Sequence, residues 1–319
     1  MRMLRHRLLY AAGFTLLVAS AVNAQTVPVR LWQDPRPIAS RDLRWGSGAP
    51  DRAPLPPFVF VEETTTGTQP KVVAKDAAGV LWDVKFGPEA HAEVAANRIV
   101  WALGYFVEEM YFLPGGAITG ASDLGRAANH IAADGMFFKA RFRRRDPALP
   151  RMEKAWSFNA NPFLGTRELS GLKILMTMIG NWDIEGDRNN AIHEVATAPG
   201  APERRYLVSD LGGTFGRMGA RHTNHSKWQL ADYQGEGFID KSDDDQIELD
   251  YDGLEWNMQV VPREHAQWFA EVAGELTDAQ LRHAFETAGA TPEEVHGFSS
   301  VFMRRVEALK AATRATASR

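Results

Sequence analysis

Runs of β-branched and aromatic residues recur in the first half of the chain, and turn residues separate them. The runs at 58–62, 71–75 and 80–86 predict a three-stranded meander. Two further runs, at 105–113 and 135–143, predict two more strands. In the last run Phe138, Ala140 and Phe142 alternate with basic residues, which predicts one buried and one solvated face.

Apolar residues at helical spacing predict five helices. The first lies among the predicted strands, where Pro88 suits its first turn and Gly104 its end. Thr166 is the predicted N-cap of the second, and capping boxes begin at Thr277 and Thr291. The five helices are expected at 89–103, 167–179, 263–274, 277–288 and 292–312, with short strands at 190–195 and 205–209.

The order of these elements is strands with one helix, followed mainly by helices. This order predicts an α+β fold with a small β-rich lobe and a larger helical lobe. The composition, 45% hydrophobic and 24% charged over 319 residues, excludes a disordered, collagen-like or coiled-coil chain. A formal net charge of −4 argues against nucleic acid as a partner. The absence of cysteine excludes disulfides, thiolate metal sites and cysteine nucleophiles.

The first 24 residues have the pattern of a secretory signal peptide. A basic start, 1–7, precedes an apolar run, 8–22, and small residues predict cleavage after Ala24. The alternative is a membrane anchor, but a run of this length is short for a bilayer, which needs about 20 residues. We therefore expect a periplasmic or secreted protein without a stable membrane span. Residues 25–57, rich in Pro, Arg and Gly, predict a loosely packed irregular arm.

Charged residues with complementary chemistry follow one another along the chain. Lys85 ends the third strand, and Glu93 lies on the helix that follows. Phosphoryl transfer requires a lysine on the nucleotide phosphates, a carboxylate that holds it, a carboxylate facing the acceptor hydroxyl, and oxygen ligands for a metal ion. Asp183, the amides of Asn189 or Asn190, and Asp210 supply the remaining roles in order.

Four short motifs resemble the protein-kinase-like superfamily in its atypical members: HipA-like kinases, CotH spore-coat kinases and secretory-pathway casein kinases. The motifs are Val84-Lys85-Phe86, Glu93-Val-Ala-Ala, Gly180-Asn-Trp-Asp183 and Asp210-Leu-Gly-Gly-Thr-Phe-Gly216. The resemblance covers about residues 58–312. It implies an N-lobe at 58–145 and a helical C-lobe at 146–319.

The resemblance also implies a role for each residue. Lys85 and Glu93 would position the phosphates of ATP or another nucleotide, and Gly67 would lie in the loop covering them. Asp183 would act as base or orient a hydroxyl acceptor, which the sequence does not identify. Asp210, with Asn190 or Asn189, would hold Mg²⁺ or Mn²⁺. The family's usual spacing from the catalytic Asp to the metal-binding Asn leads instead to Arg188, so an insertion or a role for Asp187 is needed. No Gly-x-Gly-x-x-Gly loop is present.

Two other functions remain open. One is a non-catalytic, pseudokinase-type binding module, and the other is a metal-dependent hydrolase built on His222 and His225. The acidic segment 243–252 predicts a solvated loop, with a calcium site or a basic partner as alternatives. The basic residues of 139–145 predict a strand face exposed to solvent. The alternative is that this face binds an acidic segment, such as one in the N-terminal arm.

Overall fold

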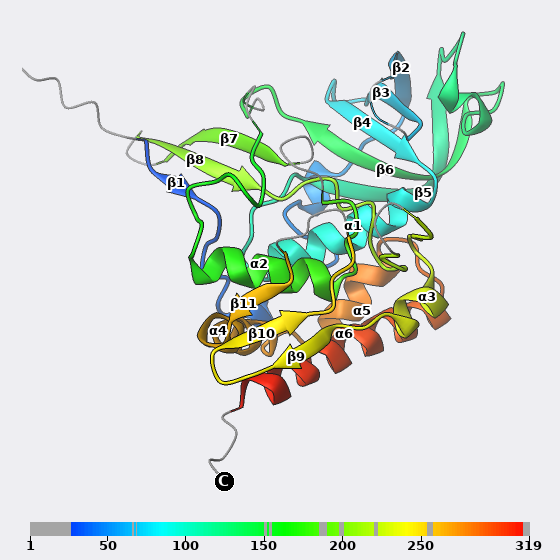
Figure 1. Ribbon diagram of the computed structural model, residues 1–319. Helices are drawn as coiled ribbons and strands as arrows, with labels where there is room; N and C mark the ends of the chain where they lie inside the picture. The colour runs from blue at the N-terminus through cyan, green and yellow to red at the C-terminus, as the bar shows by residue number, and fades with distance from the viewer. Residues whose placement is uncertain are drawn as a thin grey trace, which may run out of the picture.

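The computed structural model describes residues 27–65, 67, 69–149, 152, 155–184, 190–197, 201–219, 223–253 and 258–314 (Figure 1). The predicted signal peptide and four residues named above lie outside this part of the chain: Asp187, Arg188, Asn189 and His222. No helix among the described residues is both long enough and apolar enough to cross a membrane.

Five strands of the N-terminal half form a closed barrel in the order β2-β3-β4-β6-β5 (Figure 1). They are β2 (Phe58–Thr64), β3 (Lys71–Lys75), β4 (Leu81–Phe86), β5 (Met110–Thr119) and β6 (Met136–Arg145). Neighbouring strands are antiparallel except where β2 meets β5 in parallel and closes the barrel. Large apolar side chains fill the interior, among them Phe58, Trp82, Phe86, Phe137 and Phe142.

The strand predicted at 105–113 lies later in the chain than expected. β5 begins at Met110 and continues through Gly115 and Gly116, which pair with Phe138 and Phe137 of β6. A side chain at Gly116 would lie 3.0 Å from the ring of Phe137, so a glycine is needed for this close approach. The predicted strand ended at Leu113, before a Pro-Gly-Gly sequence of the kind that usually marks a turn.

The predicted solvated face of β6 is wrong. Lys139 has a φ of 56°, which interrupts the alternation, and Phe138 is 71% exposed while Ala140 and Phe142 are buried. Arg141 is also buried, because the other side of the strand is covered by helix α1 (Pro88–Ala102) and not by solvent. The basic side chains on this side therefore pair with carboxylates inside the protein.

The C-terminal half is mainly helical and has its own, larger core. Its helices are α2 (Arg167–Met178), α3 (Leu230–Gly235), α4 (Arg263–Ala273), α5 (Asp278–Glu286) and α6 (Pro292–Thr313). Thr166 caps α2, and the capping boxes at Thr277 and Thr291 are both present. Helix α1 contacts strands of the barrel and helix α5, so it joins the two halves (Figure 1). The predicted α+β class, β-rich first and helical afterwards, is confirmed.

Two small sheets flank the helices. β1 (Val29–Arg30) pairs in parallel with β8 (Pro202–Leu207), which pairs with β7 (Ala191–Ala196). The second sheet consists of β9 (Ile239–Ser242), β10 (Gln246–Leu249) and β11 (Val260–Pro262). The prediction of a solvated acidic loop at 243–252 is therefore wrong for β10, whose Ile247 and Leu249 are buried.

The N-terminal arm is packed and not loose. Leu31, Ile38 and Leu43 are buried in the helical core. The side-chain amide of Gln280 donates hydrogen bonds to the carbonyls of Ile38 (2.8 Å) and Arg41 (3.0 Å). Two short 3₁₀ turns, η1 (Ile38–Ser40) and η2 (Pro50–Arg52), are the helical parts of this segment. Its buried apolar residues do not recur at the spacing of a helix or a strand, so the sequence pattern does not predict their burial.

Candidate active site

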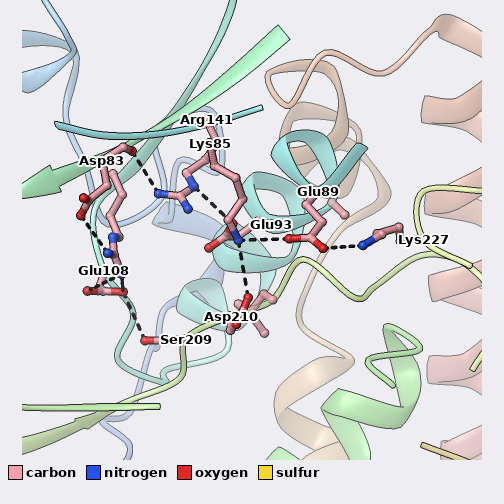
Figure 2. A network of polar contacts seen from close by, with 12 residues as sticks. Asp83, Lys85, Glu89, Glu93, Glu108, Arg141, Ser209, Asp210 and Lys227 are labelled. Atoms are coloured by element: carbon pink, nitrogen blue, oxygen red, sulfur yellow. Dashed lines mark hydrogen bonds and ion pairs between the residues drawn. The ribbon is translucent and has the colours of Figure 1, made fainter. Parts of the chain in front are cut away.

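Lys85 lies at the end of β4 with its ammonium among three carboxylates (Figure 2). Its Nζ is 2.8 Å from Glu93 Oε2, 3.2 Å from Glu89 Oε2 and 3.5 Å from Asp210 Oδ1. The two glutamates come from α1 and the aspartate from the segment after β8. The structure therefore brings together Lys85, Glu93 and Asp210, three residues that the sequence analysis selected.

The turn between β4 and α1 explains why both glutamates reach one lysine. Gly87, with a φ of 86°, reverses the chain, and Pro88 begins the helix. Glu89 lies in the first turn of α1, and Glu93 is four residues later on the same face. Two like charges at this spacing repel each other, so the Lys85 ammonium between them stabilises the arrangement.

Burial and charge act in opposite directions on this cluster. Burial penalises the charged ammonium, but Glu93, Asp210 and Glu89 outweigh that penalty and raise the pKa of Lys85. Burial likewise opposes the charged form of Glu93. Arg141 and Lys85 outweigh it and lower the pKa of Glu93 to about 2. Both groups are therefore charged at neutral pH.

A second row of ion pairs holds the first in place (Figure 2). Arg141 of β6 places its Nε 3.2 Å from Glu93 Oε2 and donates from Nη1 to the Asp83 carbonyl. Arg143 pairs with Asp83 (2.8 Å) and Glu108 (3.0 Å), whose carboxylate also accepts a hydrogen bond from Ser209 Oγ (3.2 Å). This row connects the barrel to the residue just before Asp210.

The segment 210–216 is held rigidly between the two halves. Asp210 has a φ of 51° and is followed by the buried Leu211. The amide of Phe215 donates to the Ile179 carbonyl (2.9 Å), and the amide of Trp182 donates to the Gly213 carbonyl (3.2 Å). The ring of Phe215 is buried among aromatic residues, with Phe285 at 5.1 Å and Tyr233 at 5.5 Å between ring centroids. These contacts fix the position of Asp210.

Two consecutive glycines separate the candidate carboxylates. A Cβ at Gly212 would lie 2.8 Å from Glu89 Oε2, and a Cβ at Gly213 would lie 2.8 Å from Asp183 Cβ. The segment therefore contacts two acidic side chains: Gly212 lies against Glu89, and Gly213 lies against Asp183. Any larger side chain would displace one of them, because so short a carbon contact is repulsive.

Asp183 lies beside a small cavity of about 10 Å³ that both polar and apolar side chains line. Its lining includes Asn181, Asn190 and Ser209. The Asp183 amide donates to Asn181 Oδ1 (3.1 Å), which orients the Asn181 side chain. The Asn190 amide offers this cavity an oxygen atom of the kind that Mg²⁺ and Mn²⁺ prefer. With the carboxylate of Asp210, which directly follows Ser209 of the lining, the donor set has the chemistry that suits a divalent cation.

Asn190 is the predicted metal-binding amide that the structure describes. It is buried, its Nδ2 donates to the Trp156 carbonyl (3.3 Å), and its Oδ1 accepts from the Ser209 amide (3.3 Å). A carbonyl oxygen has two lone pairs, so one remains for a cation. The alternative, Asn189, lies outside the described residues.

Gly67 reaches the site through a second lysine. Lys71 pairs directly with Lys85 across β3 and β4, and a Cβ at Gly67 would lie 3.3 Å from Lys71 Nζ. Arg126 donates to the carbonyls of Thr65 and Gly67 and fastens this loop. Burial, together with the positive charges of Lys85 and Arg141, lowers the pKa of Lys71. Like charges directly opposite on neighbouring strands are unfavourable, which an anion would relieve.

The sequence analysis missed Glu89, Lys71, Arg141 and Lys227 as site residues. Lys227 pairs with Glu89 Oε1, so Glu89 bridges two lysines (Figure 2). The four-residue spacing from Glu89 to Glu93 on one helix was the available signal for Glu89. The other three are brought in by strand pairing and by the docking of a distant segment, for which the sequence carries no local pattern.

His225 of the proposed hydrolase pair is stacked on Trp182, with ring centroids 3.8 Å apart. Its partner His222 lies outside the described residues. Within the described ranges, no group of three or more histidines, cysteines and acids could hold a metal ion.

Comparison with protein-family models and with curated proteins gives no match. Among solved structures, the chain is similar to a Helicobacter pylori proinflammatory kinase, CtkA, with 12% identity and a TM-score of 0.47 over 80% of this chain and 96% of that one. It is also similar to the Golgi casein kinase, free and with Mn and ADP bound, with 12% identity and a TM-score of 0.45. These alignments cover 85% of this chain and 78% and 77% of those chains.

Proposed function

We propose that this protein transfers a phosphoryl group from a nucleotide, ATP in the first instance, to a hydroxyl acceptor with the help of Mg²⁺ or Mn²⁺. The observation that carries the proposal is the Lys85 ammonium at the junction of Glu93, Glu89 and Asp210. Catalysis of phosphoryl transfer consists mainly of positioning and charge stabilisation, and this cluster supplies both.

Each residue of the cluster has a distinct role in the proposal. Lys85 and Lys71 bind phosphate oxygens beneath the Gly67 loop, while Glu93, paired with Arg141, holds Lys85. Asp210 and Asn190 would hold the metal ion, which would supply positive charge to the phosphates. Asp183 accepts the acceptor's proton as the hydroxyl oxygen bonds to the γ-phosphorus and the bond to the β-phosphate oxygen breaks.

The proposal extends to location and domain division. The leader, 1–24, directs the chain out of the cytoplasm, and residues 58–145 and 146–319 form the two lobes around the site. The acceptor is a protein, glycan, lipid or small molecule with a free hydroxyl.

A thermal-shift experiment on the purified protein tests the nucleotide site. We expect ATP or ADP with Mg²⁺ or Mn²⁺ to raise the melting temperature, and EDTA to abolish the rise. A ligand at about 100 times its dissociation constant stabilises by about 2.7 kcal/mol, which is readily measured. If no nucleotide shifts the melting temperature with either metal, the proposed function is wrong. A shift without ADP release from ATP would favour the non-catalytic binding module.

Gly213→Ala is expected to impair turnover through Asp183. The new Cβ would lie 2.8 Å from Asp183 Cβ, so the carboxylate must move. A displacement of about 1 Å in a reacting group costs roughly 100-fold in rate. ADP release from ATP at saturating nucleotide measures the loss. The control is Gly235→Ala, where a Cβ meets no atom within 4 Å and activity should be unchanged. Equal activity in the two variants would contradict the role of Asp183.

A further inference from the structure

Lys227 is a cation that the proposed mechanism has not yet used. Its Nζ pairs with Glu89 Oε1, while Glu89 Oε2 contacts Lys85. It also lies 5.8 Å from the centroid of the Trp182 ring, the residue before Asp183. Lys227 therefore lies across Glu89 from the candidate phosphate-binding lysine and beside the residue that precedes Asp183. Its side chain remains 24% exposed.

The backbone around Lys227 is fixed on both sides. The amides of Ser226, Trp228 and Gln229 donate to the carbonyls of Arg217 (2.9 Å), Thr214 (3.0 Å) and Phe215 (2.7 Å), respectively. Trp182 Nε1 donates to the Ser226 carbonyl (3.0 Å). These bonds attach Lys227 to the segment that carries Asp210. The Glu89 ion pair then sets where the Lys227 ammonium lies.

Strain next to Lys227 supports a functional reason for this geometry. Trp228 has a φ of 51°, a left-handed conformation that is rare for a bulky residue. Its ring packs against Phe298, with centroids 4.7 Å apart, and stacks on His91 at 5.4 Å. Such strain persists only where the surroundings impose it, and it concentrates at functional sites.

The pairing of Glu89 indicates what Lys227 binds. One carboxylate oxygen contacts each lysine, which is the pattern that a phosphoryl group with several oxygens would make. Lys85 already has Glu93 at the shorter distance of 2.8 Å, against 3.2 Å for Glu89. The Glu89 contacts are therefore the ones that an incoming phosphoryl group can replace.

We propose that Lys227 contacts the γ-phosphoryl group of the nucleotide and stabilises it during transfer. This inference rests on the proposed function. The transition state spreads negative charge over the three equatorial oxygens of the transferred group, and a single added cation there accelerates the reaction strongly. Lys227 keeps its proton throughout, because the acceptor's proton goes to Asp183 and the leaving group is the nucleoside diphosphate.

The test compares ATP with ADP in Lys227→Gln and Lys227→Arg. Calorimetry with Mg²⁺ present should show that Lys227→Gln weakens ATP binding about tenfold and leaves ADP binding unchanged, since ADP lacks the γ-phosphoryl group. In turnover, kcat should fall on the order of 100-fold or more, and Lys227→Arg should recover most of it because the charge is retained.

Lys241→Gln is the matched control. Lys241 also pairs with two carboxylates, at 3.5 and 3.6 Å, but is 73% exposed and distant from the cluster in the fold. It should behave as the parent protein in every assay. Unchanged ATP binding in Lys227→Gln, or an equal loss of ATP and ADP binding, would overturn the role of Lys227 alone. Failure of the parent protein to bind any nucleotide would overturn the proposed function and this inference together.

Discussion

We expect Asp210→Asn to abolish metal-dependent nucleotide binding while the protein stays folded. The expected result follows from the position of this carboxylate, which is 40% exposed and makes its one described ion pair with Lys85 at 3.5 Å. Lys85 keeps Glu93 and Glu89 as partners, so removing this longer contact to a part-exposed carboxylate changes the free energy of unfolding by about 1 kcal/mol. A metal ion bound to Asp210, in contrast, loses a charged ligand.

Asparagine is the correct replacement because Asp210 has a φ of 51°. Asn and Asp both tolerate the left-handed region, whereas alanine would add backbone strain to the loss of charge. Thermal shifts with Mg²⁺ or Mn²⁺ and ADP measure the effect, and urea unfolding measures stability. Asp252→Asn, an exposed position, is the control and should bind as the parent does. A full metal-dependent shift in Asp210→Asn would exclude Asp210 as a metal ligand.

Glu93→Gln destabilises the fold by about 3–5 kcal/mol, the usual cost of removing one partner from a buried ion pair. Glu93 is buried and shares its Oε2 between Lys85 (2.8 Å) and Arg141 (3.2 Å). Glutamine keeps the shape but leaves Arg141 without the carboxylate that balances it. Urea unfolding at neutral pH measures the difference from the parent protein. A loss below about 1 kcal/mol would show that the neighbouring acids replace Glu93.

The pH dependence of this difference identifies its cause. The pKa of Glu93 is about 2 in the folded protein against 4.5 ordinarily, so the unfolded chain takes up its proton first as pH falls. Glu93 therefore contributes its full stability above about pH 4.5 and loses it as pH falls toward about 2. The parent and Glu93→Gln should converge over this range. Glu264→Gln, a side chain 84% exposed, should follow the parent at every pH.

The connection from β4 to α1 was predictable because it is local. A β-branched run, a glycine and a proline at the first helical turn place Lys85 and Glu93 on consecutive elements. The capping boxes at Thr277 and Thr291 were predictable for the same reason, because each depends on residues three apart. The order of the acidic motifs along the chain also led to Asp210, which the structure places at Lys85.

Other features depend on contacts between distant segments. The parallel pairing of Phe58 with Ile118 closes the barrel, and neither strand carries a signal for its partner. The positive φ of Lys139 reverses the exposure expected for Phe138. The hairpin of β9 and β10 forms in an acidic stretch because Ile247 and Leu249 find a helical core to pack against. Tertiary packing overrode the local pattern in each case.

The sequence by itself determined the five long helices, the caps at Thr166, Thr277 and Thr291 and the chain order of the charged groups, because periodicity and capping act over a few residues. Only the tertiary structure decided which carboxylates share Lys85, that Glu89 bridges it to Lys227, and that Arg141 is buried against Glu93. An ion pair between distant segments forms where the packing of two cores brings the groups together. Its energy depends on the burial that this packing imposes, which no stretch of sequence carries alone.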